Sequence, residues 1–284
     1  MIKTINYFLQ AIVIYLFFLI GRILGLNISR KLYSQFFTLI GPLFKSKKII
    51  RENLNTYFPN ISMLDEKKII KNMWSNYGKT FIEYSFLKFF NKNKSHVTIL
   101  GLDNLVSKGE KKPVIFVSGH FANFELMSME ITKKNIPLAT IYRPLNNFFL
   151  NPFMEYLRRK YICKNQIKKG ISGVRETIEY LKKGYSIALM IDQRVSEGER
   201  IKFFNKPALT TTLPAQLSLK FNIDIVPVFI ERSHKDHFNI KFLEKIDPKN
   251  FNDKFKLSEK LNQVLEKMIK KNPSQWIWTH NRWK

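Results

Sequence analysis

The pattern of apolar and polar positions changes along the chain, and its first part is strongly apolar. Residues 4–21 carry no charged side chain and include the dense apolar run 11–20. This length is just sufficient for a helix to cross a bilayer, or for a helix to lie buried in its interface. A buried helix of a soluble domain is the alternative, and a cleaved signal peptide fits less well because no small-x-small site follows. We predict a hydrophobic membrane anchor with a basic juxtamembrane segment over residues 1–44.

The pattern then becomes helical to about Phe90, and beyond the polar cluster 91–95 short apolar runs alternate with helical ones. We predict strands over residues 97–100, 114–118, 138–142, 186–191, 225–230 and 238–243. We predict helices over residues 121–134, 148–161, 173–183, 212–221 and 257–270. Several of these strands are nearly all apolar, as in a sheet covered on both faces. Residues 45–284 therefore predict one α/β domain with a mixed, mostly parallel central sheet flanked by helices.

The excess of basic residues predicts an anionic partner. The chain has 48 Lys and Arg against 22 Asp and Glu, a formal net charge of +26. Nucleic acid, an acidic protein or an anionic membrane surface would each fit such an excess. Seven basic residues follow the apolar segment before the first acidic residue, Glu52, so the positive-inside tendency favours a cytoplasmic location for the rest of the protein. The single cysteine, Cys163, excludes an internal disulfide and a thiolate metal cluster.

The candidate chemistry lies where the predicted strand 114–118 gives way to a helix. His120 follows Ser118 and Gly119 at that point, and Glu125 comes five residues later. Strand carboxyl ends that feed helix amino ends are the usual ligand sites of α/β proteins. Gly119 allows a tight turn or the close approach of a substrate. A histidine oriented by a carboxylate is a base without a protein nucleophile, so we predict His120 as a general base and Glu125 as the residue that orients it.

Five ordered blocks resemble the bacterial lipid A biosynthesis (lauroyl/myristoyl) acyltransferases, within the lysophospholipid acyltransferase superfamily. The first is Ser-Gly-His-Phe-Ala-Asn-Phe-Glu over residues 118–125. The others are Ile-Tyr-Arg-Pro-Leu-Asn-Asn over 141–147, Ile-Asp-Gln-Arg over 191–194 followed by Glu197 and Gly198, the Phe-Phe-Asn-Lys-Pro-Ala segment that opens 203–212, and the aromatic-basic ending 276–284. The resemblance spans nearly the whole chain.

This resemblance implies transfer of a fatty acyl group from an acyl carrier protein thioester to a hydroxyl of a lipid A precursor, with no metal and no redox cofactor. It implies a location at the bacterial inner membrane, with the catalytic domain on the cytoplasmic side. The acidic carrier protein, the anionic inner leaflet and the phosphorylated acceptor would use the positive charge. Arg143 is a candidate to stabilise the oxyanion or to hold a substrate phosphate. The matched blocks also supply candidate substrate-binding residues: Gly119, Asn123, Asp192, Gln193, Glu197, Gly198, Phe204 and Thr212. Asp192 and Gln193 end a predicted strand, where they are candidates to order the site, to bind acceptor hydroxyls or to cap a turn.

Alternatives remain open from the sequence. A relative that acylates a glycerophospholipid, a glycolipid or an aminolipid would show the same blocks. A membrane-tethered nucleic-acid-binding protein would explain the charge, but it would not explain a strand-end histidine. His234 and His237 have a possible metal-ligand spacing, yet they fall between two predicted strands, where a solvated hairpin loop is expected. The aromatic ending either packs on the sheet or lies at the level of the lipid headgroups.

Overall fold

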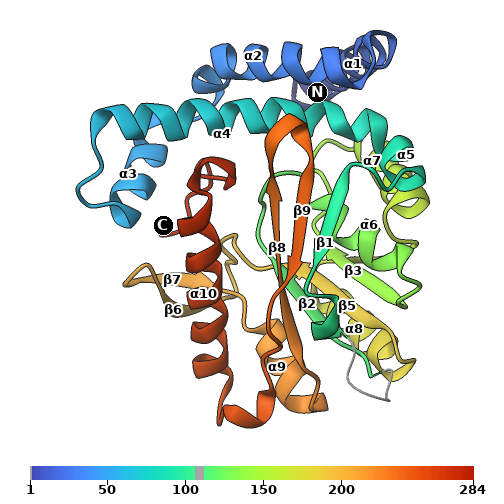
Figure 1. Ribbon diagram of the computed structural model, residues 1–284, viewed down its shortest axis with the longest axis vertical. Helices are drawn as coiled ribbons and strands as arrows, with labels where there is room; N and C mark the ends of the chain where they lie inside the picture. The colour runs from blue at the N-terminus through green and yellow to red at the C-terminus, as the bar shows by residue number, and fades with distance from the viewer. Residues whose placement is uncertain (1, 106–111) are drawn as a thin grey trace.

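A seven-stranded sheet forms the centre of the protein. The computed structural model describes residues 2–105 and 112–284 (Figure 1). The sheet has the order β1-β9-β8-β2-β5-β3-β4, and all its neighbours are parallel except the β8–β9 hairpin. Its strands are β1 (Val97–Leu100), β2 (Ile115–Ser118), β3 (Leu138–Tyr142), β4 (Asn165–Lys168), β5 (Ser186–Met190), β8 (Ile225–Arg232) and β9 (Phe238–Phe242). The predicted fold class, a mixed and mostly parallel sheet with flanking helices, is confirmed.

Helices cover both faces of this sheet. On one face lie α5 (Leu87–Lys92), α6 (Glu125–Lys133) and α7 (Asn151–Tyr161), and on the other lie α8 (Ile171–Lys182), α9 (Leu213–Phe221) and α10 (Lys254–Lys271) (Figure 1). Alternate residues of β2 pack against the helices on the two opposite faces of the sheet. Phe116 belongs to the apolar cluster of α6 and α7, and Val117 belongs to that of α10. Because strand side chains alternate between faces, a strand covered on both sides has to be apolar at every position.

Two features of the chain differ from the predicted elements. The polar strand β4 and the hairpin β6 (Glu199–Phe203) with β7 (Lys206–Thr210) were absent from the prediction. Helix α6 begins at Glu125 rather than at Phe121. The residues before it form a turn in which Ala122 has a φ of 44°, in the left-handed region that ends or precedes a helix but does not continue one.

The N-terminal helices pack on the sheet domain and on one another. Helices α2 (Leu26–Phe44) and α4 (Met63–Glu83) pack closely, because Gly78 of α4 leaves room for the backbone of Tyr33 in α2. A Cβ at Gly78 would lie 2.0 Å from the carbonyl oxygen of Tyr33. Helix α3 (Lys47–Tyr57) joins them. In Figure 1, α2 and α4 run side by side across one end of the sheet.

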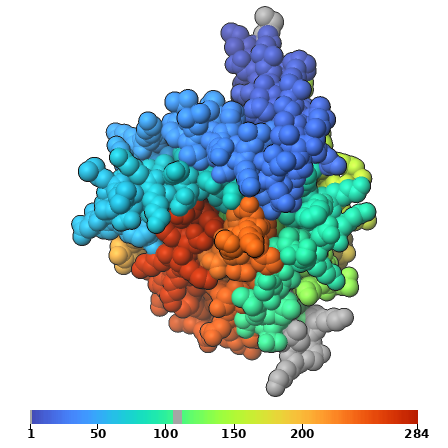
Figure 2. Space-filling model, turned by 45° about the horizontal axis from the view of Figure 1, so that its top comes forward, coloured from blue at the N-terminus to red at the C-terminus, as the bar shows by residue number. Residues whose placement is uncertain are grey.

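Helix α1 (Ile2–Leu24) is long and apolar enough to cross a membrane, judged by length and composition. One stripe of it docks on the protein: Tyr15 donates to the carbonyl oxygen of Phe149 at 2.9 Å, and Phe18 packs against Phe81 and Phe153. The opposite side is exposed and apolar along the whole helix, including Ile5, Leu9, Ile12, Leu16, Leu19 and Ile23. Figure 2 shows α1 extending beyond the body of the molecule.

The C-terminal tail is buried rather than displayed. Trp276 and Trp278 are almost fully buried, and Trp283 stacks on Phe203. The Arg282 guanidinium, also fully buried, donates to the backbone of Leu209 in the β6–β7 hairpin at 2.6 Å. Of the two alternatives for the aromatic ending, packing within the fold is therefore the one that the structure shows.

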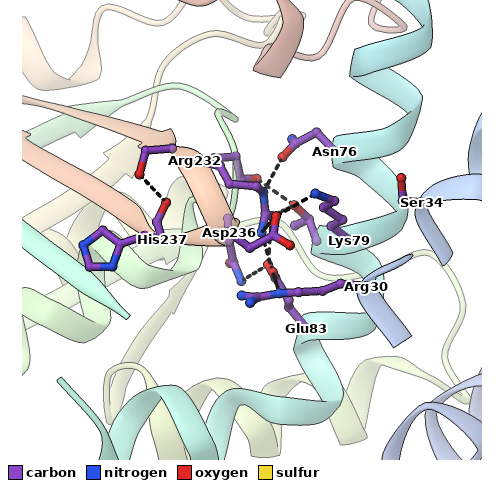
Figure 3. Close-up of polar contacts among 12 residues, drawn as sticks. Arg30, Ser34, Asn76, Lys79, Glu83, Arg232, Asp236 and His237 are labelled. Atoms are coloured by element: carbon purple, nitrogen blue, oxygen red, sulfur yellow. Dashed lines mark hydrogen bonds and ion pairs between the residues drawn. The ribbon is translucent and has the colours of Figure 1, made fainter. Parts of the chain in front are cut away.

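A buried carboxylate ties the N-terminal helices to the sheet. Glu83 of α4 is fully buried, and its oxygens accept from Arg30 of α2 at 2.7 Å and from Arg232 at the end of β8 (Figure 3). The amide of Asn123 donates to the same carboxylate at 3.0 Å. Burial by itself would raise the pKa of Glu83, but the two guanidinium groups outweigh it and hold that pKa below its usual value. In the same view Lys79 reaches Asp236, in the turn between β8 and β9, at 2.6 Å.

Replacing Glu83 by glutamine tests this network. Removing the charge leaves Arg30 and Arg232 buried without their shared counter-ion, so we expect the free energy of unfolding to fall by about 3–5 kcal/mol. Urea unfolding of the purified protein in detergent measures the change. Glu52→Gln is the matched control, because Glu52 is exposed and lies 3.9 Å from exposed Lys48; its effect should stay within about 0.5 kcal/mol. An equally small effect of Glu83→Gln would contradict the role given to the network.

Candidate active site

A cavity of about 500 Å³ opens at the carboxyl edge of β5, β3 and β4, beside the turn that carries His120. Its wall combines buried apolar side chains, among them Met127, Ile162 and Ala188, with His120 and several cationic side chains. An apolar interior with a few convergent polar groups is typical of sites for small molecules or lipid chains. Among the described residues, no group of three or more His, Cys, Asp or Glu is arranged to hold a metal ion.

The imidazole of His120 is held by Asp192. Its Nδ1 lies 2.7 Å from Oδ1 of Asp192, and its own backbone N–H donates to Oδ2 at 2.7 Å. The register of the sheet brings the two residues together: β2 and β5 are parallel neighbours with Ser118 opposite Met190, so the positions two residues beyond each strand also face each other. The indole of Trp276 completes the contact by donating to Oδ2 at 2.9 Å.

This contact determines which imidazole nitrogen is free. The side chain of Asp192 is fully buried, and although burial by itself would raise its pKa, His120 and Trp276 hold that pKa below its usual value. An ionised carboxylate only accepts hydrogen bonds, so Nδ1 carries the proton and Nε2 is left as the acceptor. Within the described residues Nε2 has no hydrogen-bond partner, and the ring is part of the cavity wall. One imidazole nitrogen is therefore fixed, and the other is open to a ligand.

The pKa of His120 is raised in this setting. Burial by itself would lower it, because the charged imidazolium is poorly solvated there. The carboxylate of Asp192 outweighs burial through its charge and its hydrogen bond, and Glu125 adds a smaller effect of the same sign. Asp192 therefore stabilises the protonated ring that forms when Nε2 accepts a proton.

Glu125, which the sequence predicts as the orienting carboxylate, has other partners. Its Oε1 accepts from the hydroxyl of Tyr84 at 2.7 Å and lies 2.6 Å from the Arg158 guanidinium. Asp192, and not Glu125, makes the contact to the imidazole nitrogen. Arg158, on α7, lines the cavity close enough to His120 to act on its charge. Glu125 thus holds the guanidinium of Arg158 rather than the imidazole of His120.

The remaining predicted site residues fall into two groups. Arg143 and Gln193 line the cavity together with His120 and Glu125. In the part of the chain that the structure describes, the wall does not include Gly119, Asn123, Asp192, Glu197, Gly198, Phe204 or Thr212. Gly119 instead permits close packing, since a Cβ there would lie 2.8 Å from the ring of Phe121 and 2.9 Å from the side chain of Leu265.

The other members of the second group have structural contacts. The Asn123 amide is buried against Glu83, and Phe204 packs edge-on against Tyr57. Thr212 precedes α9 and accepts from the amide of Gln216. Glu197 is exposed, and Gly198 approaches the backbone of Thr210. As substrate contacts these residues stay predictions.

Several cavity residues were not among the predicted site residues. Tyr84, Arg158, Lys169, Arg194 and His280 all line it. His280, from the C-terminal tail, accepts the backbone N–H of Arg194 at Nε2 at 2.8 Å, and burial lowers its pKa. Lys169 and Arg194 follow β4 and β5, so a strand-end position is the signal that such residues share with His120. For Arg158, inside a helix, the sequence carries no comparable signal.

A family model and several known proteins match this chain. The family model described as bacterial lipid A biosynthesis acyltransferase matches residues 2–284. The lipid A biosynthesis palmitoleoyltransferase of Escherichia coli K12 is 25% identical over 250 residues, covering 85% of this chain and 80% of that protein. The lauroyltransferase of the same organism is 23% identical over 245 residues, covering 84% and 78%. The crystal structure of the 1-acyl-sn-glycerophosphate acyltransferase PlsC from Thermotoga maritima aligns over 89% of this chain and 100% of that one, with 18% identity and a TM-score of 0.43.

Titration of His120 tests the assignment of Asp192. In the wild type we expect the pKa of His120 to lie above the ordinary value of 6.5. Asp192→Asn removes the largest effect that raises it and leaves the burial that lowers it, so the pKa should fall below that value. Glu125→Gln should lower it less. Proton-detected NMR of ¹⁵N-histidine-labelled protein, with the His120 signal assigned from its loss in His120→Gln, measures each value. A larger fall in Glu125→Gln than in Asp192→Asn would refute the assignment.

Proposed function

The chain belongs to the bacterial lipid A biosynthesis acyltransferases, and from that membership we propose that it transfers a fatty acyl group from an acyl carrier protein thioester to a hydroxyl of a lipid A precursor. The observation that carries this proposal is the free Nε2 of His120 at the wall of a largely apolar cavity, with Nδ1 held by Asp192. A base without a neighbouring protein nucleophile suits direct attack by the acceptor hydroxyl.

The reaction needs one proton to move twice. Nε2 of His120 takes the proton of the acceptor hydroxyl as its oxygen attacks the thioester carbonyl carbon. The tetrahedral intermediate then collapses, the C–S bond breaks, and the imidazolium returns the proton to the departing thiolate. One thioester is exchanged for one oxygen ester, and His120 ends neutral. Asp192 serves both halves because it fixes the tautomer and stabilises the imidazolium.

The developing negative charge on the carbonyl oxygen requires a fixed positive group. Arg158 supports this role: it lines the cavity, it acts on the charge of His120, and Glu125, which also accepts from Tyr84, holds it in place. A preorganised donor of this kind does not have to reorient during the reaction. Arg143, predicted for the same role, lies on the cavity wall without such support and is better suited to contacting a substrate. Gln193, also on the wall, suits binding of an acceptor hydroxyl.

The surroundings of the cavity suit a lipid acceptor and an acidic donor. The exposed apolar side of α1 favours a membrane location, and the basic residues that follow α1 favour the cytoplasmic side. An anionic leaflet and an acidic carrier protein would both be attracted by the net charge of +26.

Acyl transfer by membranes that carry the protein tests the proposal. Radiolabelled acyl carrier protein thioesters of several chain lengths would be offered with a Kdo-bearing lipid A precursor. We expect transfer by the wild type, and a loss of about 10²–10⁴-fold in kcat with His120→Ala, the range for removing a general base. His234→Ala is the matched control, because His234 lies in the turn between β8 and β9, away from the cavity wall.

Each other outcome removes a different part of the proposal. Undiminished transfer by His120→Ala would refute the mechanism. Transfer to added lysophospholipids, with none to the lipid A precursor, would keep the mechanism and replace the acceptor. Transfer from coenzyme A thioesters alone would replace the donor.

A further inference from the structure

The C-terminal tail places a second imidazole at the cavity that contains His120. His280 lines this cavity and is partly exposed. Two contacts join the tail to the segment that follows β5: the indole of Trp276 donates to Asp192 at 2.9 Å, and Nε2 of His280 accepts from the backbone N–H of Arg194 at 2.8 Å. Asp192 also holds His120. The same short segment therefore positions both imidazoles.

The hydrogen bond from Arg194 determines which nitrogen of His280 carries a proton. A backbone N–H only donates, so Nε2 is the acceptor, and Nδ1 of the neutral ring carries the proton. Among the residues that the structure describes, Nδ1 has no hydrogen-bond partner, and it is not sealed in the interior. His120 therefore offers an acceptor to a ligand in the cavity, and His280 offers a donor.

His280 is uncharged at neutral pH. Burial has the largest effect on its pKa and lowers it, because the charged ring is poorly solvated. The carboxylate of Asp192 acts in the opposite direction. The positive charges of Arg282, protonated His120 and Arg194 lower the pKa further, and the result lies below the ordinary value of 6.5. A neutral imidazole donates through one nitrogen, and it does not repel the imidazolium that forms at His120.

The backbone on both sides of His280 is anchored to the rest of the fold. Asn53 of α3 is only 4% exposed, and its amide donates to the carbonyl oxygens of Trp278 and His280 at 2.8 Å each. The buried guanidinium of Arg282 donates to the carbonyl oxygen of Leu209 at 2.6 Å. A donor held in this way does not have to reorient when charge develops on a substrate.

We propose that His280 is a catalytic residue, whose Nδ1–H donates a hydrogen bond to the thioester carbonyl oxygen as that oxygen becomes negatively charged. The inference rests on the proposed function. The hydrogen bond strengthens in the tetrahedral intermediate and weakens when the C–S bond breaks, so it lowers the barrier more than it tightens substrate binding. His280 keeps its proton throughout. Arg158, from α7, and His280, from the C-terminal tail, are together the donors of the oxyanion site.

Two substitutions separate the proposed catalytic contact from the structural contact to Arg194. The amide of glutamine is as many bonds from the backbone as Nε2 of histidine, and the amide of asparagine is as many bonds away as Nδ1. His280→Gln therefore keeps an acceptor for the Arg194 N–H and removes the donor at Nδ1. His280→Asn keeps a donor there and removes the acceptor. A purely structural role predicts that His280→Asn is the more impaired variant.

Steady-state kinetics of the two variants in detergent test the proposal. We expect His280→Gln to lower kcat about 10²–10³-fold, the range for removing one oxyanion donor. KM for the thioester should change less than about 3-fold, because the lost contact is made mainly in the transition state. His280→Asn should lose less than about 10-fold in kcat, since a donor remains. His234→Ala, the control, should leave both constants unchanged. An equal loss in the two variants, or a larger loss in His280→Asn, would overturn the proposal.

The protonation of His280 can be measured in the wild type without any turnover. In ¹⁵N-histidine-labelled protein, the His280 signals are assigned from their loss in His280→Gln. At neutral pH they should show an uncharged ring with its proton on Nδ1, as the contact with Arg194 requires. A ring with its proton on Nε2, or an imidazolium, would refute the proposal even if both variants failed to fold.

The choice of acceptor separates this inference from the proposed function. Transfer to lysophospholipids alone, with His280→Gln more impaired than His280→Asn, would support His280 as the donor and replace the proposed acceptor. Transfer to the lipid A precursor that His280→Gln leaves undiminished would refute the role of His280 and leave the proposed function standing.

Discussion

The pairing of β2 with β5 is the constraint on which the candidate active site depends. With Ser118 opposite Met190, the residues that leave the two strands run side by side, and His120 meets Asp192. The carboxylate then fixes both the ring and the backbone of the same histidine. Because parallel strands end at one edge of the sheet, the residues that follow β3 and β4 are brought to the same cavity.

The turn between β2 and α6 is held from several directions. Asn123 donates to Glu83, the hydroxyl of Thr80 donates to the carbonyl of Ala122, and the backbone N–H of Ala122 donates to the carbonyl of Gln275. The C-terminal tail and α4 therefore both reach the segment that carries His120. Through Arg30 the same network extends to α2, one of the helices next to the long apolar helix α1. A turn in an unfavourable backbone conformation, such as that of Ala122, needs such support.

Cations in this protein divide by whether they have a counter-charge. Arg30 and Arg232 are buried and share Glu83, which makes them part of the core. Arg158 is paired with Glu125 at the cavity wall. The cavity cations at the ends of β5, β3 and β4 have no such partner among the described residues, so their charge is available to a ligand. The net charge of +26 therefore includes cations with and without a counter-charge, which composition alone does not separate.

The sequence by itself determined the class of fold and predicted the position of the candidate site. Continuous apolar runs predicted the strands of a sheet covered on both faces by helices. His120, at the end of one of these strands, predicted the candidate site. It missed β4, an edge strand of polar composition, and the β6–β7 hairpin, because neither has a continuous apolar run. It assigned Glu125 to His120 because both lie in one short segment, but the helix begins only at Glu125 and the preceding turn directs that carboxylate to Arg158. The partner of His120 is 72 residues away in the chain. Only the tertiary structure could identify it, because strand order and register are set by packing between distant segments, and no local pattern encodes which strands become neighbours.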